Sequence, residues 1–440
     1  MKKKISFLLL MCCFIISKTA FAQRDSTLLS LKQAVEIALQ NNYNIKLSQN
    51  NSSIAQNNVT LGNAGILPTV SGNFTQSNSL QNTVQTRADN TLNVINNANN
   101  TNTSYGANLN WTIFDGLNMF ANYDALKQRN LLGQVRLRDT VLTTVANVMS
   151  TYYELVSQYE QIKSLKGALN ISGTQLRYAN DKFSVGRVSK LDVYNAQVSY
   201  NTDTAAYIAS KQQFKASQIA LNQLMVRDLQ MEFKVADTII VDQNIRLGDV
   251  LNKAQAENPA ILESQISQRL SEINLRQVRS TRYPNIGVNG GYARGNSNTP
   301  AGFARQQQTN GFTYGLVAQI NIFNGFNQWR RERNAKLQIN NAGINVNLTK
   351  LNVNAQINTL FSSYLSGLDL IKLGESNVQL ARKNLEISLE KYRLGTITPL
   401  EIREAQRNYL DAQVTFFNAQ YQSKIAEITL KQITASVDFL

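Results

Sequence analysis

The spacing of hydrophobic residues switches repeatedly along the chain between a period of about 3.6 and a period of two. Residues 31–63 follow the helical spacing. Beyond them, apolar residues alternate with polar ones, which is the pattern of a strand with one apolar face. The alternation predicts one strand pair at 66–77 and 104–114, and a second pair at 285–295 and 311–323.

The predicted strands have the length and pattern of membrane strands. Each has about ten residues with one apolar and one polar face, which suits a tilted strand with lipid on one side and water on the other. Val70 and Phe74 lie on the apolar side of the first strand, and Leu109 and Trp111 on that of the second. We expect the Asn-dense stretch 76–104 and the Gly/Asn/Gln stretch 295–310 to be surface loops.

A helical run of unusual length follows each strand pair. No proline occurs between Pro68 and Pro259, and the helical pattern continues from 115 to 183, a length on the order of 100 Å. Apolar residues recur there at spacings of three and four, which predicts coiled-coil packing rather than an ordinary core helix. In the first run they are Val145, Val148, Tyr152, Leu155, Tyr159 and Ile162, and in the second Ile357, Phe361, Tyr364, Leu368 and Ile371.

The chain is an internal duplication. Residues 31–68 match 247–284 without a gap, and the motif IFDG at 113–116 returns as IFNG at 322–325. We therefore predict a first repeat over 23–237, with a helical hairpin whose tip is near 186. A second repeat over 238–440 has its tip near 395.

The N-terminus has the organisation of a signal peptide. Three lysines precede an apolar run over 5–16, and a small-x-small cleavage site ends at Ala22. We predict a signal peptide over 1–22. A lipid anchor on Cys12 or Cys13 is the alternative, but both cysteines lie within the apolar run, ahead of the better cleavage site. The apolar run is too short to span a bilayer, and no longer one occurs in the chain.

The residue types argue against chemistry in the mature chain. Histidine is absent, and both cysteines lie in the predicted leader, so the commonest general base, metal ligand and thiol nucleophile are missing. We expect no enzyme, no metal site and no cofactor. Without the four leader lysines, 40 basic side chains face 29 acidic ones. They are dispersed along helical faces, so we expect no nucleic-acid partner.

Four membrane strands cannot seal themselves. Two strand edges stay unpaired, and unpaired backbone groups facing hydrocarbon cost several kcal/mol each. Two chains would give a barrel of about eight strands filled by side chains, whereas three give about twelve strands and an open lumen. We therefore predict an α+β membrane protein. Four membrane strands per chain contribute to a trimeric 12-stranded barrel, which continues into a long antiparallel coiled-coil tunnel.

Together with this architecture, two tip sequences resemble the TolC-type outer-membrane efflux family. They are FSVGRVSKLDVYNAQ at 183–197 and YRLGTITPLEIREAQ at 392–406. The resemblance implies a homotrimer in the cell outer membrane, in contact with its lipid and extending into the periplasm. It also implies a tripartite system with a periplasmic membrane-fusion adaptor and an inner-membrane pump of RND or ABC type. Small molecules such as drugs are the expected cargo.

Two other functions remain open. The duct could be the exit of a type I protein-secretion system, or the chain could form a non-conducting structural or adhesive trimer. The absence of histidine and the scarcity of methionine favour organic compounds over metal ions as cargo.

The tips combine turn residues with a role implied by the resemblance. Gly186 and Gly395 supply the left-handed conformation that ends a helix, and Ser189 and Thr398 are placed to cap the returning helix, with Pro399 in its first turn. In the family these reversal loops contact the adaptor. The resemblance gives that role to Gly186, Arg187, Val188, Ser189, Gly395, Thr396, Ile397 and Thr398.

Acidic residues near the second tip are the candidates for a gate. Glu401 and Glu404 share one helix face and fall where the family carries inward acids at its constriction, so three copies would form a six-carboxylate ring. A solvated surface pair is the alternative. Asp192 is the duplicate of Glu401 and could join the constriction. Ile397 replaces a basic locking residue of some members, so the expected tip interlock either uses Tyr392 with Arg393 or Arg403 or is absent.

Overall fold

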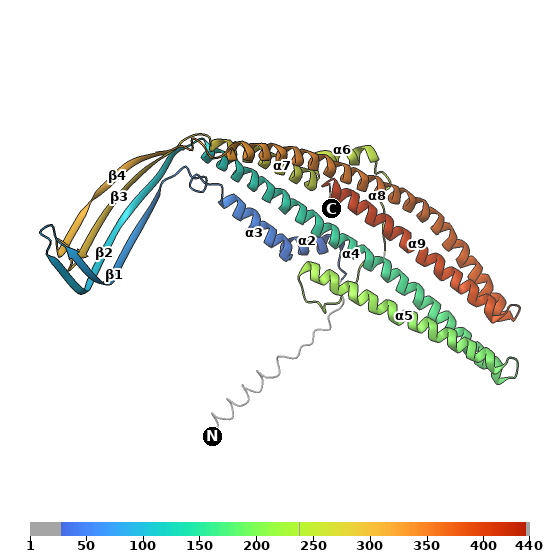
Figure 1. Ribbon diagram of the computed structural model, residues 1–440. Helices are drawn as coiled ribbons and strands as arrows, with labels where there is room; N and C mark the ends of the chain where they lie inside the picture. The colour runs from blue at the N-terminus through green and yellow to red at the C-terminus, as the bar shows by residue number, and fades with distance from the viewer. Residues whose placement is uncertain (1–27, 237, 437–440) are drawn as a thin grey trace, which may run out of the picture.

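The computed structural model describes residues 28–236 and 238–436, and the predicted signal peptide 1–22 lies outside them. The molecule is elongated, with a four-stranded sheet at one end and the tips of two helical hairpins at the other (Figure 1). No helix in the described part of the chain is long and apolar enough to cross a membrane.

The same order of elements occurs twice. The first set is α2 (Leu31–Asn41), α3 (Tyr43–Asn57), β1 (Thr69–Thr86), β2 (Leu92–Asp115), α4 (Asn118–Ser184) and α5 (Lys190–Met225). The second set is α6 (Leu247–Glu257), α7 (Pro259–Ser280), β3 (Asn285–Asn298), β4 (Gln306–Gln319), α8 (Asn327–Leu394) and α9 (Pro399–Ile433). This arrangement confirms the internal repeat and the α+β fold class.

The predicted continuous helix at 31–63 is two helices, and an asparagine explains the break. The Asn42 side chain accepts hydrogen bonds from the backbone of Asn44 and Ile45, so it ends α2 and caps α3. Its amide also donates to the Leu224 carbonyl at 2.9 Å. The duplicate Asn258 caps α7 in the same way and donates to the Ile433 carbonyl at 2.9 Å. Each asparagine thus ties a short helix pair to the end of a returning helix.

The sheet is antiparallel in the order β1-β2-β3-β4, and its faces agree with the predicted alternation. Val70 lies opposite Leu109, Leu109 opposite Gly290, and Gly290 opposite Tyr314. The other face carries polar side chains, for example Ser71 on β1. One apolar face therefore continues across all four strands.

The predicted strand bounds were wrong at the far end of the sheet. The predicted loop 76–104 is mostly strand, and only 87–91 connect β1 to β2. The turn between β3 and β4 spans 299–305 instead of 295–310, and β4 ends at Gln319, four residues before the predicted end. In the Asn-rich stretch most residues on both faces are polar, so the sequence carries no alternation there, whereas the backbone ladder still forms.

The helices form a curved row in the order α8, α9, α4, α5, with the short helices beside it (Figure 1). The core of the first repeat gathers around Val148 and Leu155 of α4, and that of the second around Ile357 of α8 and Leu430 of α9. α4 and α9 lie inside the row, and α5 and α8 form its two edges. The long helices confirm the predicted helical tunnel wall.

Candidate entrance site at the helical tips

Both tips reverse the chain through a left-handed glycine, as the sequence predicts. Gly186 has a φ of 73° and Gly395 a φ of 79°. Ser189 then caps α5 and Thr398 caps α9. The two tips therefore share one local conformation, which the residues of each turn determine.

Two of the predicted gate acids, Asp192 and Glu401, take part in the capping boxes of the tips. Asp192 accepts a hydrogen bond from the Ser189 backbone N–H at 2.9 Å, and Glu401 accepts one from the Thr398 N–H at 2.7 Å. The Thr398 backbone N–H and hydroxyl lower the pKa of the Glu401 carboxyl. Both carboxylates thus have a structural role at a helix start, where the helix dipole also favours negative charge.

Glu404, the third predicted gate acid, is in a different situation. Its carboxylate is exposed and lies 4.0 Å from the Arg407 guanidinium, a distance typical of a weak surface pair. Of the three acids, Glu404 has the carboxylate that is most available to a lumen or a partner.

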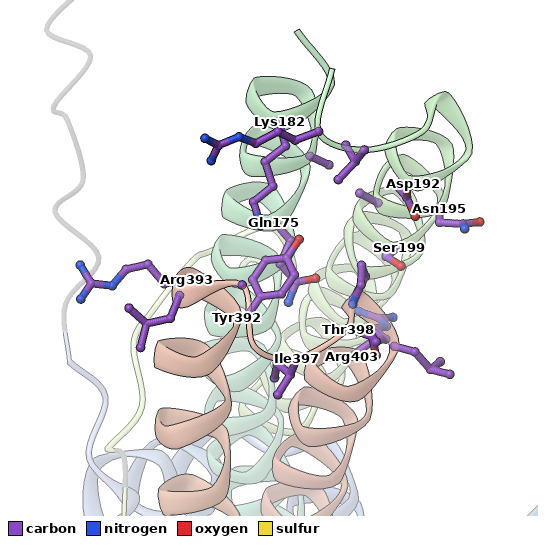
Figure 2. A pocket seen from close by; sticks show the side chains of 18 residues that line it. Gln175, Lys182, Asp192, Asn195, Ser199, Tyr392, Arg393, Ile397, Thr398 and Arg403 are labelled. Carbon is purple, nitrogen blue, oxygen red and sulfur yellow. The ribbon is translucent and has the colours of Figure 1, made fainter. Parts of the chain in front are cut away.

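A cavity of about 760 Å³ lies between the two tips (Figure 2). Lys182 of α4 and Asp192 of α5 line one side, and Tyr392 of α8 and Arg403 of α9 line the other. In Figure 2 the Tyr392 ring points across the cavity toward α4, whereas the Arg393 side chain points away from it. Of the residues predicted to interlock, Tyr392 therefore points toward the first hairpin, whereas Arg393 does not.

Tyr392 faces the first hairpin and Arg393 does not. Tyr392 is only 7% exposed, and the Lys182 ammonium lies 4.9 Å from its ring centre. Burial raises the pKa of the Tyr392 hydroxyl, and the negative charge of Asp192 raises it further. Arg393 is exposed and pairs with Glu390 on its own helix at 3.1 Å. The geometry thus supports Tyr392 as a contact between hairpins and does not support Arg393.

Arg403 makes an ion pair between the hairpins. Its guanidinium donates to the Asp203 carboxylate of α5 at 2.8 Å. Gln406 donates to the same oxygen at 3.0 Å and to the Ala168 carbonyl of α4 at 2.9 Å. Asp203 is only 6% exposed. One buried carboxylate therefore accepts two hydrogen bonds from α9.

Asp203 was not among the residues predicted for the tips, although it is the partner of Arg403. Its position is 11 residues after Asp192, which is about three helical turns and therefore the same helix face. That spacing was the available signal. An acid on the face of the tip residues is a candidate partner for any base on the facing helix.

In the part of the chain that the structure describes, no group of three or more His, Cys, Asp or Glu side chains could hold a metal ion.

Comparison with known proteins identifies the architecture. The profile of the family described as "Outer membrane efflux protein" matches residues 34–226 and 250–436. The chain is 22% identical over 292 residues to outer membrane protein TolC of Vibrio cholerae, an alignment that covers 66% of each chain, about two thirds of that relative. It is 21% identical over 423 residues to outer membrane efflux protein BepC of Brucella suis, covering 96% of this chain and 88% of that one.

Solved outer-membrane channels share the fold. The Campylobacter jejuni CmeC channel superimposes with a TM-score of 0.78 at 18% identity, covering 92% of this chain and 85% of CmeC. The Vibrio cholerae VceC structure gives a TM-score of 0.73 at 16% identity, covering 92% of this chain and 96% of VceC.

Proposed function

The chain belongs to the outer membrane efflux protein family, and from this premise we propose that three copies form a continuous duct from the periplasm through the outer membrane. It is an outer-membrane protein that extends into the periplasm, and its family and fold are those of channels rather than enzymes. In the proposed duct, β-sheets from the three copies make the barrel, and the rows of long helices make the tunnel.

The positions of the edges carry this proposal. β1 and β4 are the edge strands of the sheet, and α5 and α8 are the edge helices of the row. β2 leads into α4, next to α5, and β4 leads into α8. The edges β1 and α5 therefore lie on one side of the molecule, and the edges β4 and α8 lie on the other. A single rotation about a common axis would pair β4 with β1 of the next copy and α8 with its α5.

The edge helices carry apolar stripes that suit such contacts. On α8, large apolar residues recur every seven positions and are 58–71% exposed in the single chain: Leu373, Leu380, Ile387 and Leu394. On α5, exposed apolar residues are spaced by three, four and ten positions, which keeps them in one heptad register: Leu191, Tyr194, Val198 and Ile208. Two heptad stripes of this kind pack knobs into holes, and their burial favours association. Three copies give about twelve strands, enough for an open lumen.

The tips are the proposed entrance. Glu404, with Glu401 and Asp192, would form the acidic constriction, and the contacts of Tyr392 and Arg403 with the first hairpin would hold it closed. The exposed turn residues around Gly186 and Gly395 would contact a periplasmic adaptor that joins the duct to an RND or ABC pump in the inner membrane. Small organic molecules such as drugs are the proposed cargo.

Conductance across planar bilayers tests this proposal. Purified trimers should conduct, and Glu401→Gln with Glu404→Gln should reduce the preference for cations over anions, because the ring would lose its negative charge. Glu375→Gln, an exposed acid on α8 well away from the tip, is the matched control. Trimers that never conduct would favour the structural or adhesive alternative. Conductance with unchanged selectivity would leave the two acids with their roles in capping and at the surface only.

A further inference from the structure

We propose that the far end of the β1–β2 hairpin forms a cap over the exit of the duct and limits the size of solutes that pass it. This segment, residues 83–95, is called the exit arm below. The inference rests on the proposed duct, because it needs a lumen to cover, but it concerns the end opposite the predicted gate. It assigns a function to the Asn-rich stretch, for which a surface loop was predicted.

The exit arm extends beyond the rest of the sheet. β3 ends at Asn298, which pairs with Thr101 of β2. β2 nevertheless begins nine residues earlier, at Leu92, and stays paired with β1 as far as Thr86. The last part of this hairpin is therefore a two-stranded ribbon without support from β3 and β4.

A β-bulge bends the ribbon where the exit arm begins. Gln81 pairs with Ala98, but the next pair is Thr83 with Ile95, so β2 contains one extra residue there. Asn97 adopts a φ of 55°, and its backbone N–H donates to the Asn82 side chain at 2.8 Å. Such a bulge bends the strand and increases its twist. Asn82 and Asn97 thus stabilise the bend at which the ribbon changes direction.

The pattern of burial shows the direction of the bend. Ala98 is 3% exposed and lies on the polar face of the sheet, as its partner Gln81 does. Beyond it, Gln85 and Ile95 on that same face are half-buried, whereas Val84 and Val94 on the opposite face are exposed. The ribbon therefore folds toward the polar face, and Ala98 fills the inside of the bend.

A hydrogen bond holds the exit arm across the neighbouring turn. The Gln85 side-chain amide donates to the Ala301 carbonyl, in the β3–β4 turn, at 2.8 Å. Figure 1 shows the β1–β2 tip lying across the end of β3 and β4. The arm is thus folded over the end of its own sheet instead of continuing straight.

Simple geometry gives the exit arm enough reach to cover a lumen. The polar face would line the lumen, and a barrel of twelve tilted strands has a radius of about 12 Å. From Thr83 to the end of its turn the arm is roughly 20 Å long at about 3.3 Å per residue. Three arms folded inward would therefore meet near the axis.

The chemistry of the exit arm suits selection by size. Between 83 and 95 the charged residues are Arg87 and Asp89, both in the turn, and the others are Asn, Gln, Thr, Ala and aliphatic side chains. Neutral amides and hydroxyls neither attract nor repel ions strongly. The cap would therefore exclude wide solutes whatever their charge.

Cysteine labelling from outside intact cells tests the cap, because the only native cysteines lie in the predicted leader. Ser71→Cys places a thiol on the polar face of the barrel, and Asp89→Cys places one at the end of the exit arm as the accessible control. A small membrane-impermeant maleimide should label both sites. A maleimide on a polymer coil of roughly 12 Å, narrower than the lumen once the inward side chains are allowed for, should label Ser71→Cys roughly tenfold more slowly than Asp89→Cys.

Two variants open the cap by different means. One replaces 83–95 with an Asn-Gly turn. In this variant the polymer maleimide should label Ser71→Cys at a rate within about threefold of that of the small maleimide. The other, Ala98→Phe, fills the inside of the bend and should give a similar gain with a full-length arm. Asn99→Phe, on the opposite face of the same strand, is the matched control and should change little.

The outcomes separate the cap from the duct itself. Equal polymer labelling of Ser71→Cys in the native arm and in both variants would overturn the cap but leave the duct intact. If even the small reagent fails to reach Ser71→Cys while it labels Asp89→Cys, the polar face does not line an open lumen, and the proposed duct fails with the cap.

Discussion

The two helical hairpins have nearly the same local structure but different surroundings. α4 and α8 have 67 and 68 residues, α5 and α9 have 36 and 35, and each tip uses a left-handed glycine followed by a capping box. However, α4 lies inside the helical row, whereas α8 forms an edge and exposes a stripe of leucines. A duplicated sequence thus conserves turns and helix lengths, while position in the row decides which face each helix buries.

The link at the tips shows the same asymmetry. The repeat places Tyr194 at the position equivalent to Arg403, and Ala412 at that equivalent to Asp203. The ion pair between α9 and α5 therefore has no duplicate in the opposite direction. Only one of the two hairpins supplies the base, and only the other supplies the acid.

The largest difference that we expect between the hairpins is in assembly. Leu380→Glu puts a charge into the stripe on α8, and burying it next to α5 of another copy should cost about 3 kcal/mol per interface, about 9 kcal/mol per trimer. Light scattering of the purified protein should then show monomers. Gln379→Glu, at the adjacent exposed position, is the control. A stable Leu380→Glu trimer would show that this stripe is not the contact between copies.

The two strand-to-helix turns should respond differently to the same substitution. Gly116 and Gly325 both have a positive φ, but a Cβ on Gly116 would collide with the Ser280 carbonyl oxygen, whereas a Cβ on Gly325 would meet the Asn327 side chain at an ordinary contact distance of 3.9 Å. Gly325→Ala should cost about 1–2 kcal/mol from backbone strain alone, and Gly116→Ala more than about 3 kcal/mol. Thermal unfolding in detergent measures both. Equal losses would mean that α7 moves freely away from the first turn.

The ion pair between Arg403 and Asp203 should stabilise the closed entrance more than the exposed pair between Arg393 and Glu390 does. Asp203→Asn leaves Arg403 without a charged partner at a half-buried position, and we expect a loss of about 2–3 kcal/mol of contact between the hairpins. The open fraction of single-channel recordings should rise. Glu390→Gln, which breaks the exposed pair with Arg393, should leave that fraction unchanged. If both variants behave alike, the buried pair does not hold the entrance closed.

The smallest expected effect concerns the cap of α9 and its pH dependence. Because the folded tip lowers the pKa of Glu401, its carboxylate stabilises the tip at neutral pH, and this contribution disappears as the pH falls through the lowered pKa. The protection factor of the Ile402 amide, which is corrected for the intrinsic exchange rate, should therefore fall in acid. Glu401→Gln should flatten that dependence and change protection at neutral pH only slightly, since glutamine also serves in a capping box. If protection of Ile402 in Glu401→Gln still falls in acid as it does in the native protein, other carboxyl groups cause that pH dependence.

Much of this fold is determined by short stretches of sequence. The left-handed glycines, the N-caps Ser189 and Thr398, the length of the long helices and the apolar face of the strands were all predicted. These features depend on residues within about four positions of one another, or on a simple period, so the sequence displays them directly. The internal repeat then indicates that each feature occurs twice.

Other features depend on contacts between residues far apart in the chain, and only the tertiary structure decided them. Asp203 and Arg403 are 200 residues apart, and Gln85 and Ala301 are 216 apart, so no local pattern connects them. The Asn-rich ribbon has mostly polar residues on both faces, which removes the alternation that reveals a strand, and its ladder of backbone hydrogen bonds forms regardless of side chain. Long-range packing likewise determines which helix lies at an edge, because two similar helices differ only in their neighbours.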